Sequence, residues 1–326
     1  MRLLSVKQKY VALFSALVLI ICTTTLGLSG CSENEIKDSG KLTVVATVFP
    51  AYDWTKEILG DNGELTLLSG NGTDLHSYEP SARDMSKIAT CDMFIYVGGE
   101  SDKWAEDILK TSAKKEVIAI NLLKVLGEAV VEEKELEGME HSHEEEENPQ
   151  TDEHVWLSLK NAQTVCGYIA EQLGNIDGEN AHLYTENAKK YNEKLDLLDT
   201  KYKEAVKTAR YDTLLFADRF PFRYLTDDLG LNCYAAFSGC SAETEAGAQT
   251  IAFLSAKLKE LNLPAVMIID GSDGSIASTV IKTAKGTQKI LTLNSMQSVT
   301  QKDLEKGITY FSVMESNLEI LKEALN

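Results

Sequence analysis

The sequence predicts an α/β protein made of two parallel-sheet domains that one long rigid helix joins. In both halves of the chain, short apolar runs rich in β-branched residues alternate with helical segments, and this alternation is typical of parallel sheets covered by helices. Between the halves, residues 178–210 contain neither proline nor glycine after the first position. A chain of 326 residues is also long enough for two domains with separate cores.

Residues 1–30 predict an export signal. They carry three basic residues ahead of an apolar run and no acidic residue, which is the order of a secretory signal. The run is short for a spanning helix. Small residues precede Cys31, so this end resembles the lipobox of bacterial lipoproteins; a spanning anchor and a free cysteine are the alternatives. We expect a lipidated Cys31 followed by a polar tether over residues 31–40.

The acidic composition excludes one class of partner. The full chain has a formal net charge of −18, and the three basic residues of the signal are lost on cleavage. A chain with this negative charge is repelled by the phosphates of nucleic acid and is not expected to bind it. The charge concentrates cations near the surface but specifies no site.

The first domain is expected over residues 41–174. Strands are predicted at 42–48, 64–68, 93–97 and 117–120, and helices at 52–59, 82–90 and 102–111. The first strand is a continuous apolar run, which suits burial on both faces of a parallel sheet. Ligands bind at the carboxyl ends of such strands. His76 follows the carboxyl end of the second strand.

His76 is predicted to lie in a short loop that leads into a helix. Pro80 disfavours helix for Glu79, and Ser81 followed by Asp84 resembles a helix N-cap with an acidic residue in the first turn. A ligand could reach the imidazole there, although a lone loop histidine is more often an ordinary surface residue.

Residues 132–150 are predicted to form a disordered or loosely held acidic loop. Nine glutamates and the pair His141 and His143 lie in it. It is either a solvated loop or a weak gatherer of cations. After it, His154 enters just ahead of a helix over 158–173.

The linking segment is predicted over residues 175–210 and the second domain over 211–326. Tyrosine, alanine and leucine recur at spacings of three and four along 178–210, which predicts a helix with one buried face. The second domain repeats the α/β pattern, with strands at 214–217, 232–237, 265–269 and 289–293, and helices at 220–229, 243–261, 276–284 and 318–324.

Four further cysteines follow the predicted signal and Cys31. Cys233 and Cys240 are close in sequence and form the most plausible disulfide of an exported chain; free thiols are the alternative. Cys91 and Cys166 lie in apolar surroundings and are predicted to be buried.

Three features together resemble the metal-binding solute receptors of ABC importers for zinc and manganese. They are the stretch at 75–84 with His76, the stretch at 152–157 with His154, and the long helix between two α/β domains. The resemblance implies that both histidines are ligands in a metal cleft between the domains. It also implies a monomeric, membrane-anchored, extracytoplasmic receptor, not an enzyme, that delivers Zn²⁺, or Mn²⁺, to an ABC permease.

The second domain departs from the family's pattern. The third ligand, a His or Glu, falls at Arg219, which stays protonated and cannot coordinate, and the fourth, usually an Asp, falls at Asn294. We expect Asp218 or Glu243 to complete the site. Asp218 could instead pair with an arginine, and Glu243 could be an acid in the first turn of a helix. Lesser candidates are Cys240, Glu245, Asp270 and Asn294 itself.

Two imidazoles with one or two oxygens suit Zn²⁺, and an oxygen-rich set would also suit Mn²⁺. Because imidazole must be deprotonated to bind, we expect binding to weaken as the pH falls through about 6.5. Two alternatives remain. Arg219 and Arg223 could bind an anionic or chelated-metal solute. A metallohydrolase is disfavoured because no His-Glu-x-x-His or Gly-x-Ser-x-Gly motif is present.

Overall fold

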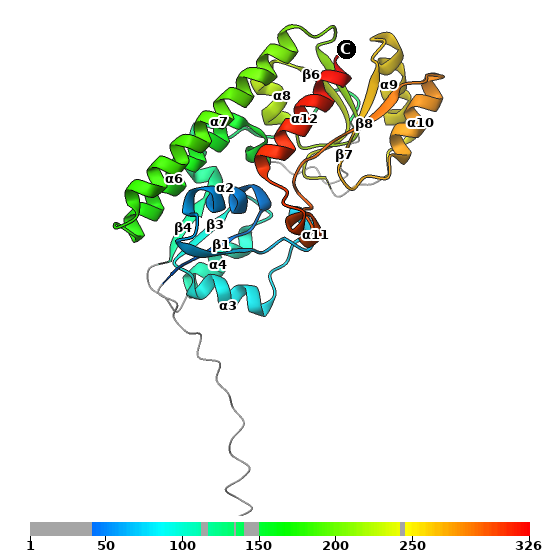
Figure 1. Ribbon diagram of the computed structural model, residues 1–326. Coiled ribbons are helices and arrows are strands. Elements are labelled where there is room, and N and C mark those ends of the chain that lie inside the picture. The colour runs from blue at the N-terminus through cyan, green and yellow to red at the C-terminus, as the bar shows by residue number, and fades with distance from the viewer. Residues whose placement is uncertain (1–40, 112–116, 134, 140–149, 242–244) are drawn as a thin grey trace, which may run out of the picture. The chain divides into compact units, whose positions relative to one another are not determined.

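The computed structural model describes residues 41–111, 117–133, 135–139, 150–241 and 245–326 (Figure 1). Residues 42–326 group into one unit by their contacts. The predicted signal, the tether and Cys31 lie outside the described residues. Within those residues, no helix combines the length and apolar character that a bilayer crossing needs.

The first sheet has the strand order β2-β1-β3-β4, and all of its strands are parallel. Its elements are β1 (Leu42–Ala46), α2 (Phe49–Leu59), β2 (Gly63–Leu67), α3 (Ala82–Thr90), β3 (Met93–Tyr96), α4 (Lys103–Thr111), β4 (Ile118–Asn121) and α5 (Leu122–Leu126). Successive strand side chains point to opposite faces. Val44 and Ile95 therefore share a core with α2, whereas Val45 and Phe94 share one with α3 and α4. Figure 1 shows these helices on opposite sides of the sheet.

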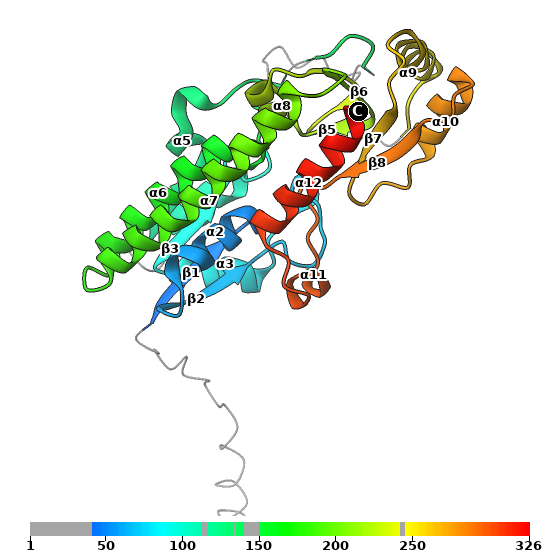
Figure 2. The same cartoon turned by 45° about the horizontal axis from the view of Figure 1, so that its top comes forward.

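The second sheet repeats this plan with the parallel order β6-β5-β7-β8. Its elements are β5 (Thr213–Phe220), α8 (Arg223–Leu229), β6 (Asn232–Ser238), α9 (Ala248–Glu260), β7 (Ala265–Ile269), α10 (Ser275–Ala284), β8 (Lys289–Leu293), α11 (Gln301–Glu305) and α12 (Tyr310–Ala324). Leu215 and Val266 pack with α9 and α10, whereas Leu214 and Met267 face the core that includes α12. Figure 2 shows α12 on the side of the sheet away from α9 and α10.

Two long helices run beside each other along one side of both sheets, α6 (Leu159–Ile176) and α7 (Ala181–Lys207) (Figures 1 and 2). Helix α7 has 27 residues and would span roughly 40 Å. It contacts α2 near the first sheet and α8 and α12 near the second. Its buried side chains recur at spacings of three and four, as the sequence predicts: Tyr184, Ala188, Tyr191, Leu195, Leu198 and Tyr202.

The predicted fold class is confirmed, and most element limits agree within a few residues. The last helix is the main exception, since it begins at Tyr310 and not at residue 318. Thr309 and Ser312 form a capping box at its start, and Asp53 of α2 accepts a hydrogen bond from the Tyr310 amide at 2.7 Å. Helices α5 and α11 were not predicted, and α9 begins five residues later than expected.

The expectation of a loosely held acidic loop is wrong for its described ends. Glu132 and Thr151 form an isolated antiparallel bridge that closes the base of the loop, and Met139 is buried in the core. Gly138 lies so close to the Phe253 ring that a Cβ on it would overlap the ring. The apolar contacts of these residues hold the segment to the second domain. His141 and His143 lie outside the described residues.

Candidate metal centre

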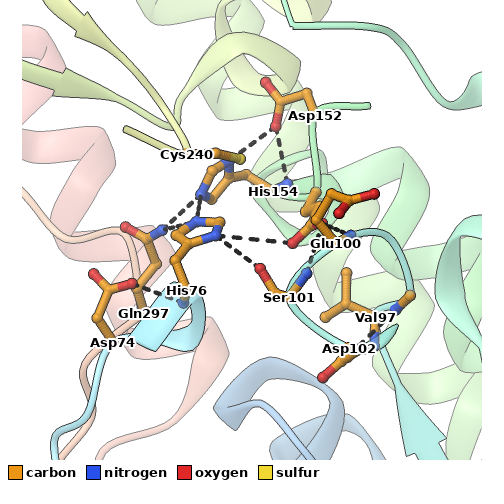
Figure 3. Close-up of polar contacts among 12 residues, drawn as sticks. Asp74, His76, Val97, Glu100, Ser101, Asp102, Asp152, His154, Cys240 and Gln297 are labelled. Carbon is orange, nitrogen blue, oxygen red and sulfur yellow. Dashed lines mark hydrogen bonds and ion pairs between the residues drawn. The ribbon is translucent and has the colours of Figure 1, made fainter. Parts of the chain in front are cut away.

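Four side chains from four separate loops converge where the two domains meet (Figure 3). The Nε2 atoms of His76 and His154 are 3.1 Å apart. The ligand atoms of the histidines and the Sγ atom of Cys240 all lie within 4.8 Å of one another. Gln297 places its amide nitrogen 2.6 Å from His154 Nε2 and 3.2 Å from His76 Nε2. The first domain supplies the two histidines and the second supplies the cysteine and the glutamine.

His76 stands in a short 3-10 turn, Leu75–Ser77, beyond the carboxyl end of β2. Leu75 is buried and anchors the turn, and the Asp74 carboxylate accepts a hydrogen bond from the His76 amide at 3.0 Å. The ring nitrogen Nδ1 lies 2.8 Å from Ser101 Oγ, so Nε2 is the nitrogen that faces His154. The predicted loop and the Ser81 cap of the following helix are both present.

His154 is more firmly held. Asp152 Oδ1 accepts hydrogen bonds from both the His154 amide and its Nδ1, each at 2.9 Å. The carboxylate keeps the proton on Nδ1, which leaves a lone pair on Nε2 directed into the site. The His154 side chain is fully buried, whereas that of His76 is 13% exposed.

Contacts with the second domain hold the His154 segment in place. The Trp156 indole donates to the Ser295 carbonyl oxygen at 2.8 Å. The Tyr224 hydroxyl donates to the Asp152 carbonyl oxygen at 2.8 Å, and the Tyr310 hydroxyl donates to the Trp156 carbonyl oxygen at 2.7 Å. His154 therefore has a fixed position relative to both sheets.

Cys240 reaches the site because the residue before it is a glycine. A Cβ on Gly239 would lie 3.0 Å from His154 Cε1 and 3.0 Å from the Phe220 carbonyl oxygen. Only a residue without a side chain lets the loop after β6 pass so close to the imidazole. The Cys240 amide then donates to Glu133 at 2.9 Å, which ties the cysteine to the base of the acidic loop.

Gln297 is held in the loop that follows β8. Asp270 accepts hydrogen bonds from the amide and the hydroxyl of Ser295 at 2.5 and 2.8 Å, and Asn294 Oδ1 accepts from the Met296 amide at 2.8 Å. These contacts fix the turn that points Gln297 at the histidines. The Gln297 side chain is buried, and its Oε1 atom has no hydrogen-bond partner among the described residues.

Burial disfavours a charge on the free side chains at the centre. Burial, and then the neighbouring His154, lower the pKa of His76 to about 4, so both ring nitrogens stay available for hydrogen bonds or coordination at neutral pH. Burial raises the pKa of Glu153, whose Oε2 atom lies 3.9 Å from His76 Nδ1. Burial and the adjacent Glu133 raise the pKa of the Cys240 thiol. Neutral nitrogen donors beside buried carboxyl groups attract a cation.

The structure does not bring Asp218 into this cluster. Asp218 sits at an irregularity in the pairing of β5, between Phe216 and Arg219. Its carboxylate accepts hydrogen bonds from the Arg219 amide at 2.8 Å and the Ile269 amide at 3.5 Å. These contacts hold the carboxyl ends of β5 and β7 together. Among the described residues, Asp218 is not one of those whose ligand atoms converge with the two histidines. Glu243 lies outside the described residues, and Glu245 is exposed.

The expected fourth position also differs from the observed one. Asn294 and Asp270 hold the loop after β8, and Gln297, three residues beyond Asn294, is the side chain that reaches the imidazoles. The sequence analysis did not consider Gln297. Its only sequence signal is a polar residue between Met296 and Ser298 in an otherwise ordinary loop.

Arg219 makes an ion pair across the two domains. Its guanidinium lies 2.9 Å from Asp74 Oδ2, the same aspartate that caps the His76 turn. This contact and the adjacent hydrogen bonds lower the pKa of Asp74 despite its burial. Arg223 pairs with Asp227 at 3.2 Å. Each arginine therefore already has a carboxylate partner within the chain.

The disulfide between Cys233 and Cys240 is not formed. None of the four cysteines among the described residues takes part in a disulfide, and Cys91 and Cys166 are buried as predicted. Cys233 is the second residue of the extended strand β6 and Cys240 follows the end of that strand, which separates them by about 20 Å. A disulfide requires Cα atoms within about 7 Å.

A family model described as "Zinc-uptake complex component A periplasmic" matches residues 44–324. The chain belongs to this family. The resemblance inferred from residues 75–84, residues 152–157 and the long helix is thereby confirmed. This family description names a component of an uptake complex and not an enzyme.

Two relatives illustrate the likeness within the zinc-uptake component family. The zinc-binding lipoprotein AdcA of Streptococcus pneumoniae serotype 4 is 34% identical over 309 residues, which cover 94% of this chain and 60% of AdcA. The high-affinity zinc uptake system protein ZnuA of Bacillus subtilis is 28% identical, with 94% of this chain and 96% of ZnuA covered. The chain thus spans less than two thirds of the length of the AdcA relative.

Solved structures of the family share the architecture. The Zn(II)-bound ZnuA-like domain of S. pneumoniae AdcA is 31% identical to this chain with a TM-score of 0.70, over 88% of this chain and 99% of that domain. The metal-dependent lipoprotein YcdH of B. subtilis is 27% identical with a TM-score of 0.73, over 88% of this chain and 100% of YcdH.

Proposed function

We propose that this chain is an extracytoplasmic receptor that captures Zn²⁺ between its two domains and delivers it to an ABC permease. The cation is cargo, so the protein needs no catalytic group and acts as a carrier. The observation that carries the proposal is the pair of buried imidazoles whose Nε2 atoms lie 3.1 Å apart.

The spacing of the histidines supports a shared cation. Two nitrogen ligands at the usual Zn–N distance and a tetrahedral angle are about 3.4 Å apart. The observed 3.1 Å is close to this value. Asp152 directs one lone pair toward the same point. A cation between the rings would bind both nitrogens, and the nearby Asp152 carboxylate would stabilise it through His154.

The names of the relatives support zinc as the cargo. AdcA is named a zinc-binding lipoprotein, ZnuA a zinc uptake protein, and the solved AdcA domain is zinc-bound. An anionic or chelated solute is disfavoured because Arg219 and Arg223 are already paired with Asp74 and Asp227. Mn²⁺ remains the competing cargo, and His76 and His154 alone do not distinguish the two metals.

Elemental analysis and zinc titration against a chromophoric chelator test the proposal. We expect one tight zinc site in the wild-type protein and its loss in His76→Ala and in His154→Ala. His182→Ala is the matched control, because His182 is an exposed histidine on α7. Equal zinc binding by the wild type and both site variants would contradict the proposal.

The membrane anchor is a separate part of the proposal. We propose cleavage after residue 30, lipidation of Cys31, a tether over 31–40, domains over 41–174 and 211–326, and a linking segment over 175–210. The lipoprotein name of AdcA supports an anchored receptor. Cys31→Ala should move the protein from the membrane fraction to the soluble fraction without changing its zinc affinity. Membrane retention of that variant would contradict lipidation at this residue.

A further inference from the structure

We propose that Cys240 binds the cation as a thiolate, with the Gln297 amide oxygen as a fourth donor, and that this donor set makes the chain select Zn²⁺ over Mn²⁺. The inference rests on the proposed function, since it names the remaining ligands of the same site and the class of cation that they favour.

The position of Cys240 is the first support. Its Sγ atom and the two imidazole nitrogens lie within 4.8 Å of one another. At the usual Zn–N and Zn–S distances, a nitrogen and a sulfur on one tetrahedral zinc are about 3.6 Å apart. The sulfur therefore needs to approach by roughly 1 Å at most. Gly239 makes this possible, because its backbone already passes against the His154 ring.

Gln297 is an independent second support. Its side chain is only 4% exposed and its Oε1 atom lacks a partner among the described residues, whereas Nε2 faces both imidazoles. A half-turn of the carboxamide exchanges nitrogen and oxygen and presents Oε1 to the same point. A buried amide oxygen without a partner is costly. A cation at the centre would satisfy it.

Coordination converts the thiol to a thiolate. The S–H bond of Cys240 breaks, a metal–sulfur bond forms, and the proton leaves to the adjacent Glu133 carboxylate and then to water. Glu133 is in place for this step because it accepts the Cys240 amide at 2.9 Å. The sulfur keeps its electron pair and no oxidant or reductant is required.

The donor set explains the choice of cation. Thiolate and imidazole donors suit Zn²⁺, whereas Mn²⁺ prefers carboxylate, carbonyl and water oxygens. The converging group contains two histidines and a cysteine and, within the described residues, no aspartate or glutamate. The nearby carboxylates of Asp152 and Glu153 instead hold ring or backbone nitrogens. Among the described residues that converge here, the Gln297 amide is the group that offers an oxygen to the cation.

The test compares Zn²⁺ and Mn²⁺ affinities of the wild type, Cys240→Ser and Cys233→Ser in a reducing buffer that does not bind metal. Cys233 is the matched control, since it is a half-buried cysteine of β6 outside any disulfide and lies about 20 Å from Cys240. We expect Cys240→Ser to lose zinc affinity by at least ~100-fold, more than loss of an outer-shell partner costs. Its Mn²⁺ affinity should change far less, and Cys233→Ser should match the wild type.

Cobalt supplies a direct readout of the sulfur. Co²⁺-loaded wild-type protein and Cys233→Ser should show a thiolate-to-cobalt charge-transfer band in the near ultraviolet. Cys240→Ser should bind Co²⁺ without that band. Gln297→Glu replaces the amide with a carboxylate and should raise Mn²⁺ affinity by about tenfold; unchanged Mn²⁺ affinity would overturn the role of Gln297.

Failure of this inference is distinct from failure of the proposed function. If zinc binding needs both histidines but the cobalt band is absent, or persists in Cys240→Ser, the thiolate assignment is overturned and the receptor function stands. If the wild-type protein binds no divalent cation, the proposed function itself fails.

Discussion

The two domains contribute to the site in different ways. In the first domain, each imidazole has its outer nitrogen held by a neighbour, Ser101 for His76 and Asp152 for His154. In the second domain, Cys240 and Gln297 are placed by loop geometry, through Gly239 and the turn after β8. The first half is built from short local motifs, whereas the second depends on how distant loops pack. Donors of the first kind are the better preorganised.

Removal of the two histidines should give the largest effects, and unequal ones. His154→Ala is expected to weaken zinc binding by about 1,000-fold and His76→Ala by about 100-fold. Loss of a residue that only supports a ligand typically weakens metal binding by about 10- to 100-fold, and loss of a ligand should cost at least as much. The two losses differ because His154 is fully buried and oriented by a carboxylate, whereas His76 is partly exposed. Competition titration measures both. A larger loss in His76→Ala would reverse the ranking.

The pH dependence of the metal-free protein isolates the contribution of His76. Its pKa falls to about 4 on folding, against about 6.5 in the unfolded chain. Between these values the unfolded state binds an extra proton, so stability is lost as the pH falls through this window. We expect about 2–3 kcal/mol less stability at about pH 4.5 than at about pH 7 from this group.

The comparison with His76→Gln is the appropriate control for that measurement. Burial raises the pKa of Asp102 to about 7 and of Asp53 to about 6, and these groups act in the opposite direction because the folded state holds their protons. Their contributions cancel in the difference between variant and wild type. The free energy of unfolding is measured by urea titration at each pH. If it changes equally with pH in the two proteins, the assignment to His76 is wrong. The low pKa also moves the expected onset of His76 protonation below the value of about 6.5 predicted from sequence.

Asp152→Asn tests the support of His154 without removing a ligand. The amide cannot hold the imidazole with a negative charge, so we expect zinc affinity to fall by about 10- to 100-fold. Asp227→Asn is the matched control, because Asp227 pairs with Arg223 away from the histidines. Zinc affinities within threefold of the wild type, about the measurement error, would show that the Asp152 contact is dispensable.

Arg219→Ala should have the smallest effect on zinc affinity. The Arg219 and Asp74 side chains are each only about one-fifth exposed and form one ion pair, so loss of one partner should cost stability, by up to about 3–5 kcal/mol. Zinc affinity should change by less than about tenfold, since the guanidinium does not coordinate. Thermal unfolding and zinc titration measure the two quantities. Complete loss of zinc binding would show that the ion pair is required to form the His76 turn.

The fold was predictable because its signals are local. The helix at 82–90 has its own capping box, and the strands at 265–269 and 289–293 are bounded runs that the structure reproduces without change. The start of α12 was missed although Thr309 and Ser312 form a local capping box there, and its other support is Asp53, which is more than 250 residues away in the chain. A contact between residues so far apart in the chain cannot be predicted from local sequence patterns.

The same distinction applies to the site. His76 and His154 stand in motifs whose neighbours already indicate a held imidazole. Cys240 was only a lesser candidate and Gln297 was missed, because a cysteine after a glycine and a glutamine in a loop have no distinctive local pattern. Their proximity to the histidines arises only when β6 and β8 bring their carboxyl ends to the first domain.

The hydrogen bond from Trp156 to Ser295 has a kinetic consequence for the proposed release of the cation. Together with hydrogen bonds from the Tyr224 and Tyr310 hydroxyls, it holds the segment that contains His154 to the second domain. Unloading by a wide separation of the domains would break all three bonds and expose buried apolar surface. For the proposed receptor, the alternative route is retreat of the His76 turn, whose Asp74 carboxylate forms an ion pair with Arg219 of the second domain. We expect this route to set the off-rate of the cargo.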